Sequence, residues 1–262
     1  MHVTVLGSGS AGNCTLIETE TTSILIDAGL SARQILYRLQ LIGRNLNRLN
    51  GIVLTHEHTD HTRALAVLCR TESLPVYANR LTAEAIATDP DWSSRARISW
   101  RLFATGHSFE IGDLTVDSFS VPHDAQDPVG FTIRHGTQTV GVLTDLGHAT
   151  KLVIERVRDT DVLVLEANHD LKLLQEDAAR PWALKQRIMS RHGHLSNDAA
   201  ATLASEVSGS RLRHVFLAHL SRDCNRPDLA QRVVADKLHQ IGASHIAVSV
   251  ASQDHPSATV NI

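Results

Sequence analysis

Short runs of apolar residues alternate with polar segments along the chain, and their spacing predicts strands and helices in turn. Runs typical of buried strands lie at 2–6, 14–19, 23–27, 51–54, 75–78, 109–113, 114–121, 139–144, 161–165, 214–218 and 246–250. Helical periodicity is found at 31–43, from about 62 to 69, at 81–87, from Ser196 onwards and at 228–241. This alternation predicts an α/β fold, and we expect residues 1–262 to form one domain.

The segment Thr-His-Glu-His-Thr-Asp-His at 55–61 directly follows one of these predicted strands and precedes a predicted helix. Side chains on an extended segment point the same way every second residue, so His56 and His58 can reach one metal ion. The turn that follows directs Asp60 and His61 towards a second ion. Imidazole and carboxylate suit zinc, and also manganese or iron, so the residue types leave the metal open. A histidine-rich surface loop is the alternative, which the preceding strand disfavours.

Two features near the N-terminus have competing interpretations. Residues 7–12, Gly-Ser-Gly-Ser-Ala-Gly, match the glycine fingerprint of dinucleotide-binding folds. That fold requires a helix after the glycines, whereas a β-rich segment follows here, so we expect a tight loop near the site instead. Asp27 ends the predicted strand at 23–27. Its carboxylate either orients a ligand histidine or caps the helix that begins near Ser31.

Residues that can bind metals also follow predicted strands in the second half of the chain. The strand at 114–121 leads to His123, that at 139–144 to Asp145, that at 161–165 to the segment Glu-Ala-Asn-His-Asp at 166–170, and that at 214–218 to His219. Sites in open α/β sheets lie at the carboxyl ends of strands. The repetition therefore predicts that these residues gather around the 55–61 motif.

The segment 178–197 is basic and contains no acidic residue. Its cations are Arg180, Lys185, Arg187 and Arg191, and it leads into His194 and Ser196, where a helix is predicted to begin. A helix N-terminus beside basic side chains favours phosphate, so this segment is a candidate phosphate-binding lip. A solvated basic helix followed by an N-cap serine explains the same pattern equally well.

Composition narrows the classes of function. The chain has 262 residues, of which 42% are hydrophobic, and it contains no long uninterrupted apolar run, so we expect a cytoplasmic protein without a membrane segment. The three cysteines are far apart in sequence, which argues against a disulfide framework and a cysteine-type zinc site. A net charge of −3 means that any affinity for nucleic acid must come from a local patch.

The order of the candidate ligands resembles that of the ligand motifs in the metallo-β-lactamase superfamily of metallohydrolases: Asp27, His56-x-His58-x-Asp60-His61, His123, Asp145 and His219. The resemblance extends from one end of the chain to the other and implies a four-layer αββα sandwich. It also implies two divalent metal ions. One is bound by His56, His58 and His123, the other by Asp60, His61 and His219, and Asp145 bridges both.

Finer features resemble nucleic-acid-processing members of this superfamily. His194-Leu-Ser196 lies where tRNA 3′ processing endonucleases of this fold have a catalytic histidine. The segments 123–125, 144–147, 166–170, 193–197 and 219–225 are similar to those of the YycJ/WalJ-type single-domain members, which are regarded as DNA exonucleases acting from the 5′ end. Two positions depart from that pattern, with Cys224 in place of an expected asparagine and His148 in place of an aromatic residue.

The resemblance implies a phosphodiesterase with nucleic acid, and DNA in particular, as its substrate and partner. We expect Asp60 and Asp145 to position the attacking hydroxide, and His194, or alternatively His169, to protonate the leaving oxygen. We expect the hydroxyl and amide groups of Asn168, Ser196, Ser221 and Asn225 to contact phosphate. We expect Lys185 and Arg187 to follow the polynucleotide backbone. An aromatic content of only 4% keeps a small-molecule hydrolase of the same fold, a cyclic phosphodiesterase or lactonase, as the main alternative. A regulatory or binding module that has lost catalysis is the third class of function.

Overall fold

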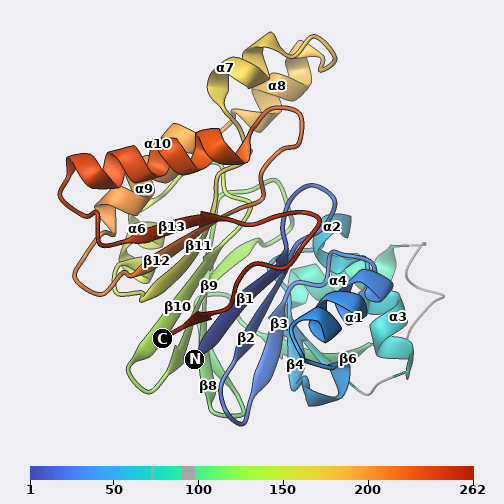
Figure 1. Cartoon of the computed structure of the whole chain (residues 1–262). Helices are drawn as coiled ribbons and strands as arrows, with labels where there is room; N and C mark the ends of the chain where they lie inside the picture. Colours follow the sequence, from blue (N-terminus) through green and yellow to red (C-terminus); the bar gives the residue numbers. More distant parts are fainter. Residues whose placement is uncertain (72–73, 90–97) are drawn as a thin grey trace.

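The computed structural model, which describes residues 1–71, 74–89 and 98–262, contains two seven-stranded sheets that face each other (Figure 1). The first sheet consists, in spatial order, of β14 (Val260–Asn261), β1 (His2–Gly7), β2 (Cys14–Glu18), β3 (Ser23–Ile26), β4 (Gly51–Val53), β5 (Pro75–Asn79) and β6 (Ser99–Phe103). The second consists of β13 (Ala247–Val250), β12 (His214–Ala218), β11 (Val162–Glu166), β10 (Gln138–Leu143), β9 (Val129–His135), β8 (Leu114–Ser120) and β7 (Ser108–Ile111).

Alternating side chains explain why the sheets stack face to face. In β11, Val162 and Val164 lie in the core between the two sheets, whereas Leu163 and Leu165 pack against the helices outside. Both faces of this central strand are therefore buried, which is why its sequence is continuously apolar. Removing this apolar surface from water supplies the main driving force for the layered arrangement.

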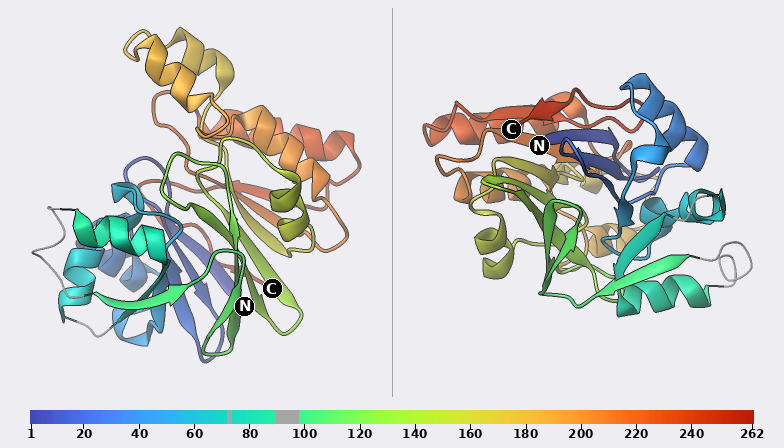
Figure 2. Two further views of the ribbon diagram at one scale, coloured as in Figure 1. Left: turned by 180° about the vertical axis from the view of Figure 1, so that it is seen from behind. Right: turned by 90° about the horizontal axis from the view of Figure 1, so that it is seen from below.

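Helices cover the outer face of each sheet and complete a four-layer αββα sandwich (Figure 2). The first sheet is covered by α1 (Ala32–Leu41), α3 (Leu65–Thr71) and α4 (Arg80–Thr88), and the second by α6 (Lys151–Val157), α9 (Asn197–Glu206) and α10 (Pro227–Gln240). In α1, Ser31 caps the N-terminus by accepting a hydrogen bond from the amide of Gln34, and Ile35 and Leu39 bury one face. The predicted α/β sandwich is confirmed.

Shorter helices follow strands at the edge where the candidate ligands were expected: α2 (Thr59–Thr62), α7 (Leu171–Glu176) and α8 (Trp182–Ile188). The short helix η1 (Leu46–Arg48) precedes β4 and lies at the opposite edge. We call residues 171–192 the α7–α8 arm, because the two helices project from the body of the molecule (Figure 1). No helix in the described part of the chain is long and apolar enough to cross a membrane.

The sequence pattern predicts most of these elements and misses a few. Predicted strands coincide with β1 to β5, β7, β8 and β10 to β13 to within a few residues, and α9 begins at the predicted N-cap Ser196. The pattern does not predict β6, β9, β14, α6 or α7. The β-rich segment after the glycine run is strand β2, which confirms that the run is no dinucleotide fingerprint.

Candidate metal centre and active site

Three residues with a left-handed backbone follow strands of the two sheets. Asp27 follows β3, Asp145 lies just beyond β10 and His219 follows β12, with φ angles of 61°, 57° and 54°. A positive φ is uncommon for residues other than glycine and carries a cost of about 1 kcal/mol or more. Among the described residues other than glycine, only these three have it. The strain is thus confined to residues whose side chains meet in one cluster.

The 55–61 motif is held against β3 by Asp27. The Asp27 carboxylate accepts hydrogen bonds from the backbone amide of Thr55 at 2.9 Å and from Nδ1 of His61 at 2.7 Å. Gly29 allows the close approach of this segment, since a Cβ there would lie 1.5 Å from the carbonyl oxygen of Asp60. Of the two interpretations of Asp27, the structure supports the one in which it orients a histidine, because Ser31 caps α1 instead.

Two further candidate histidines, His123 and His219, are oriented in the same way, through Nδ1. His123 donates from Nδ1 to the carbonyl oxygen of Gly193 at 3.1 Å, and His219 donates from Nδ1 to Glu166 at 2.9 Å. The buried Nε2 atoms of both rings have no hydrogen-bond partner among the described residues. A protein acceptor on one ring nitrogen that leaves the other for a metal is the usual arrangement around bound ions.

Four groups of side chains place their ligand atoms within 4.8 Å of one another. One consists of His56, His58 and His123, a second of Asp60, His61 and His219, a third of His56, His61 and Asp145, and a fourth of Asp145, Glu166, His194 and His219. The first two are the two ligand sets expected from the sequence, and Asp145 lies between them. Its carboxylate is 2.9 Å from Nε2 of His61 and 3.9 Å from Nε2 of His123.

Buried charge makes this cluster suited to cations. Burial disfavours a charged imidazole at His61, yet the neighbouring carboxylates of Asp27, Asp145 and Asp60 raise its pKa well above the ordinary value. Burial likewise opposes ionisation of Asp145, but the charges of His219 and His61 lower its pKa well below the ordinary value. Carboxylates held ionised in a buried site require positive charge. The donor set of imidazole and carboxylate therefore fits divalent metal ions.

Glu166 connects the metal cluster to His194. It is fully buried at the end of β11, where Oε1 accepts hydrogen bonds from Nδ1 of His194 at 2.7 Å and Nδ1 of His219 at 2.9 Å. Its other oxygen accepts from the amides of Leu146 and Leu195, each at 3.0 Å. Burial raises the pKa of Glu166, but the charge of His194 and the hydrogen bonds from His194 and His219 together outweigh it and lower the pKa to about 2. The sequence predicts that the segment 166–170 lies near the site, but it does not predict that Glu166 orients two histidines.

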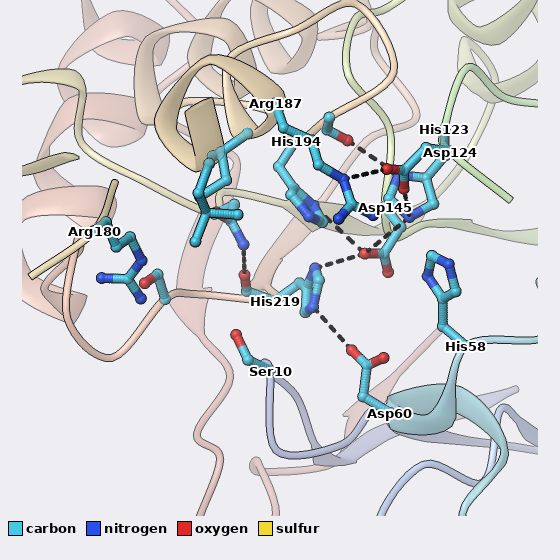
Figure 3. Close-up of a pocket in the computed structure, with 15 residues that line it drawn as sticks. Ser10, His58, Asp60, His123, Asp124, Asp145, Arg180, Arg187, His194 and His219 are labelled. Carbon is cyan, nitrogen blue, oxygen red and sulfur yellow. Dashed lines mark hydrogen bonds and ion pairs between the residues drawn. The ribbon is translucent and has the colours of Figure 1, made fainter. Parts of the chain in front are cut away.

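A cavity of about 340 Å³ opens directly onto the cluster (Figure 3). His58, Asp60, His123, Asp145 and His219 line its metal-binding side. Its remaining described lining residues are Ser10, Asp124, Asn168, Arg180, Leu184, Arg187, Ile188, Gly193, His194 and Ser221. The glycine run at 7–12 contributes through its loop residue Ser10, as predicted. The cavity thus combines candidate metal ligands, cations, hydroxyls and an amide around one space.

Comparison with known proteins agrees with this geometry. The family model for the beta-lactamase superfamily domain matches residues 22–219. The chain belongs to the beta-lactamase superfamily. It is 34% identical to exodeoxyribonuclease YycJ of Bacillus anthracis over 249 residues, which cover 92% of this chain and 90% of that protein. It is also 34% identical to exodeoxyribonuclease WalJ of Streptococcus pneumoniae, over 90% of this chain and 87% of that protein.

Solved structures of this superfamily share the fold at low sequence identity. YhfI of Bacillus subtilis superposes with a TM-score of 0.71 at 18% identity, over 98% of each chain. The Zn²⁺-bound PqqB of Methylobacterium extorquens superposes with a TM-score of 0.73 at 17% identity, over 100% of each chain. YhfI is described as a metallo-β-lactamase-fold protein, and the similarity to it confirms the predicted fold.

Several residues expected to contact substrate instead form hydrogen bonds within the protein. Lys185 does not face the cavity: its side chain is buried and Nζ donates to the carbonyl oxygen of Gln175 at 2.7 Å. Asn225 is also buried, and its amide pairs with the side chain of Asn197 and with the carbonyl of Ala167. Neither residue lines the cavity, and the polar atoms of both have partners within the protein, so the structure does not bring these two expected residues to the site.

Two further expected residues, Ser196 and His169, do not line the cavity. Ser196 caps α9 by accepting a hydrogen bond from the amide of Ala199, and it is absent from the cavity lining. The N-cap interpretation of Ser196 is confirmed, whereas the phosphate-binding lip stays a prediction. His169 is 1% exposed and does not line the cavity, and burial lowers its pKa to about 4, which disfavours it relative to His194 as a proton donor. Asn168, Ser221, Arg187 and Arg180 do line the cavity.

Proposed function

We propose that this chain is a metal-dependent phosphodiesterase that hydrolyses DNA from the 5′ end, with two divalent ions in a single domain formed by residues 1–262. The observation that carries the proposal is the cavity in which two candidate ligand sets, His194 and two arginines face one space. Bound ions of this kind activate water and neutralise charge on phosphate oxygens. Zinc and manganese suit the donors best, and iron is compatible with them.

The ligand assignment follows from the contacts described above. His56, His58 and His123 would hold one ion and Asp60, His61 and His219 the other, with the Asp145 carboxylate close to both sets. Asp27 and Glu166 act as positioning residues, because they fix the Nδ1 atoms of His61 and His219 and leave each Nε2 for a metal. Asp60, 24% exposed at its side chain and facing the cavity, is placed to orient the attacking water.

His194 is the proposed proton donor to the leaving oxygen. Its Nδ1 is bonded to Glu166 at 2.7 Å, which leaves Nε2 for the cavity that the ring lines. Burial opposes protonation, but the charge and hydrogen bond of Glu166 raise the pKa of His194 above its ordinary value. The imidazole therefore carries a proton near neutral pH and can give it to an oxygen in the cavity.

A polynucleotide substrate is supported by the relatives and by the rim of the cavity. The two exodeoxyribonucleases match this chain over nearly its whole length. Arg180 and Arg187 lie at the cavity, where guanidinium groups can bind phosphates next to the scissile one. A cytoplasmic location, where DNA is accessible, is part of the proposal.

Hydrolysis of a defined substrate panel tests this function. Purified protein with Mn²⁺ or Zn²⁺ is incubated with 5′-end-labelled single- and double-stranded DNA, RNA of the same sequence and a chromogenic phosphodiester. We expect release of labelled short products from DNA at early times, as a 5′ exonuclease requires. Internal cleavage, preference for RNA, or hydrolysis of the small diester alone would each contradict the proposal, and the last would favour the small-molecule hydrolase.

A further inference from the structure

The cavity contains an apolar pair that metal binding does not explain. Of the described residues that line it, only Leu184 and Ile188 have aliphatic side chains, and both come from α8. The other lining residues are polar, charged or glycine. Leu184 remains 40% exposed, so packing within the protein does not use up its surface. An active-site cavity with one apolar wall is suited to a substrate with an apolar face beside its charged group.

Helix α8 places the apolar pair beside Arg187. Arg187 and Ile188 lie three and four positions after Leu184, so both are its neighbours on the helix surface. Lys185 lies on another face, where its Nζ donates to the carbonyl of Gln175. Arg187 bonds Asp124 through Nε at 2.6 Å, which leaves the ends of its guanidinium for another anion. Figure 3 shows Arg187 and His194 across the cavity from Ser10 and Asp60.

The arm that carries this wall is fixed at its base to the catalytic cluster. It lies between Glu166 and His194 in sequence, two residues that are bonded to each other. Gly193 closes its end tightly, since a Cβ there would lie 2.1 Å from the carbonyl oxygen of Ile188. Arg191 contributes a second anchor through Nε2 of His148 at 2.8 Å. The apolar pair therefore has a fixed position relative to the metal ligands.

We propose that Leu184 and Ile188 form an apolar shelf for a nucleobase next to the scissile phosphate, so that α8 selects diesters that carry bases. The inference rests on the proposed function and adds a determinant of specificity to it. The phosphate lies at the metal cluster, Arg187 contacts the backbone and the flat face of the base packs on the aliphatic side chains. Contacts to a base face, unlike hydrogen bonds to its edge, do not distinguish one base from another.

Oligonucleotides that lack bases test the shelf. Two 5′-labelled single strands are compared, one normal and one with tetrahydrofuran residues in place of the two nucleotides that flank the first scissile phosphate. We expect kcat/KM of the unmodified protein to fall about 10-fold on the abasic strand, the lower range for loss of a base contact. On the normal strand, kcat/KM of the L184A/I188A variant should also be about 10-fold lower than that of the unmodified protein. On the abasic strand the two proteins should have the same kcat/KM, because removing the base and removing the shelf abolish the same contact.

A matched control separates the shelf from damage to the arm. Leu171 has the same 40% exposure on α7 but does not line the cavity, so Leu171→Ala should leave both rates unchanged. Circular dichroism and metal content of each variant establish that fold and metal sites persist. Equal loss by L184A/I188A on both strands, or equal rates of the unmodified protein on both, would overturn the shelf. Failure of the unmodified protein to cleave either strand would instead overturn the proposed function, and the shelf with it.

Discussion

The metal cluster and the α7–α8 arm are adjacent but are built in opposite ways. In the cluster, His61 and His219 are buried and each is held by carboxylates from other strands. The arm projects from the body and is joined to it by pairs such as Arg187–Asp124, in which Arg187 is 64% exposed. Buried pairs are strongly coupled to their surroundings, whereas exposed pairs contribute little stability.

This difference assigns the two regions different tasks. Chemistry requires ligand positions that do not move, and the cluster obtains them from two sheets that bury their strand ends. Substrate choice requires accessible side chains that can be substituted without loss of the fold, and Arg187 and Leu184 of the arm are accessible in this way. Substitutions in the cluster should therefore abolish turnover, whereas substitutions in the arm should change the preference among substrates.

The largest effect is expected from loss of a metal ligand. His58→Ala or Asp145→Ala should reduce hydrolysis of every substrate to the uncatalysed background, because an incomplete ligand set no longer holds its ion. Elemental analysis of the purified variants should show less metal per chain than in the unmodified protein. Retention of both metal and activity in Asp145→Ala would show that it does not belong to the centre.

A smaller effect is expected from His194, which lies at the boundary of the two regions. His194→Ala should lower kcat by about 10²-fold on DNA, the usual scale for loss of a proton donor, while the metal content stays the same. A chromogenic diester with a good leaving group needs less protonation and should be affected less. If the variant loses an ion, His194 is a ligand and not the proton donor.

Asp27 provides a test of positioning within the cluster. Asp27→Asn keeps the shape of the side chain but weakens the acceptor for Nδ1 of His61, and we expect metal affinity to fall about 10- to 100-fold. Competition with a chromophoric chelator measures that affinity, and activity should return at saturating metal. A loss of activity that excess metal does not restore would contradict a role confined to orientation.

The smallest effect is expected in the arm. Arg187→Ala should raise KM for DNA several-fold and reduce the salt dependence of binding by about one unit in the log–log slope, since one phosphate contact is lost. A small diester should be cleaved at an unchanged rate. Arg158→Ala is the matched control, because Arg158 is also exposed and ion-paired but does not line the cavity. Equal loss on both substrates would indicate that Arg187 supports the active site itself.

The same comparison explains how far the sequence alone predicts the site. A strand that is buried on both faces appears in the sequence as an apolar run that ends at a polar residue, so Asp145 and His219 could be identified from the sequence alone. Asp27 and the 55–61 motif follow the same rule. Glu166 was expected near the site by the same rule, but its positioning role was not predicted, because that role depends on His194 and His219, which lie 28 and 53 residues away in the chain.

The sequence did not predict which residues reach the cavity where side-chain direction depends on local tertiary structure. The basic segment correctly indicated that Arg180 and Arg187 lie at the cavity, but it did not show that α7 would pack beside α8 and give Lys185 a backbone acceptor. In the same way, the sequence does not show that the side-chain amide of Asn225 forms hydrogen bonds with that of Asn197. Polar residues on strands have fewer possible directions than those on an arm, which is why strand ends were the more predictable class.

Activity as a function of metal equivalents tests the central claim most directly. Metal-stripped protein is titrated with Mn²⁺ or Zn²⁺ at protein concentrations well above the dissociation constants, and hydrolysis of 5′-labelled DNA is followed at each point. We predict no hydrolysis without metal and a maximum near two equivalents, because the proposed centre assigns His123 and His219 to separate ions, and their side chains belong to separate ligand groups. A maximum at one equivalent, or full activity in the stripped protein, would contradict a two-metal phosphodiesterase.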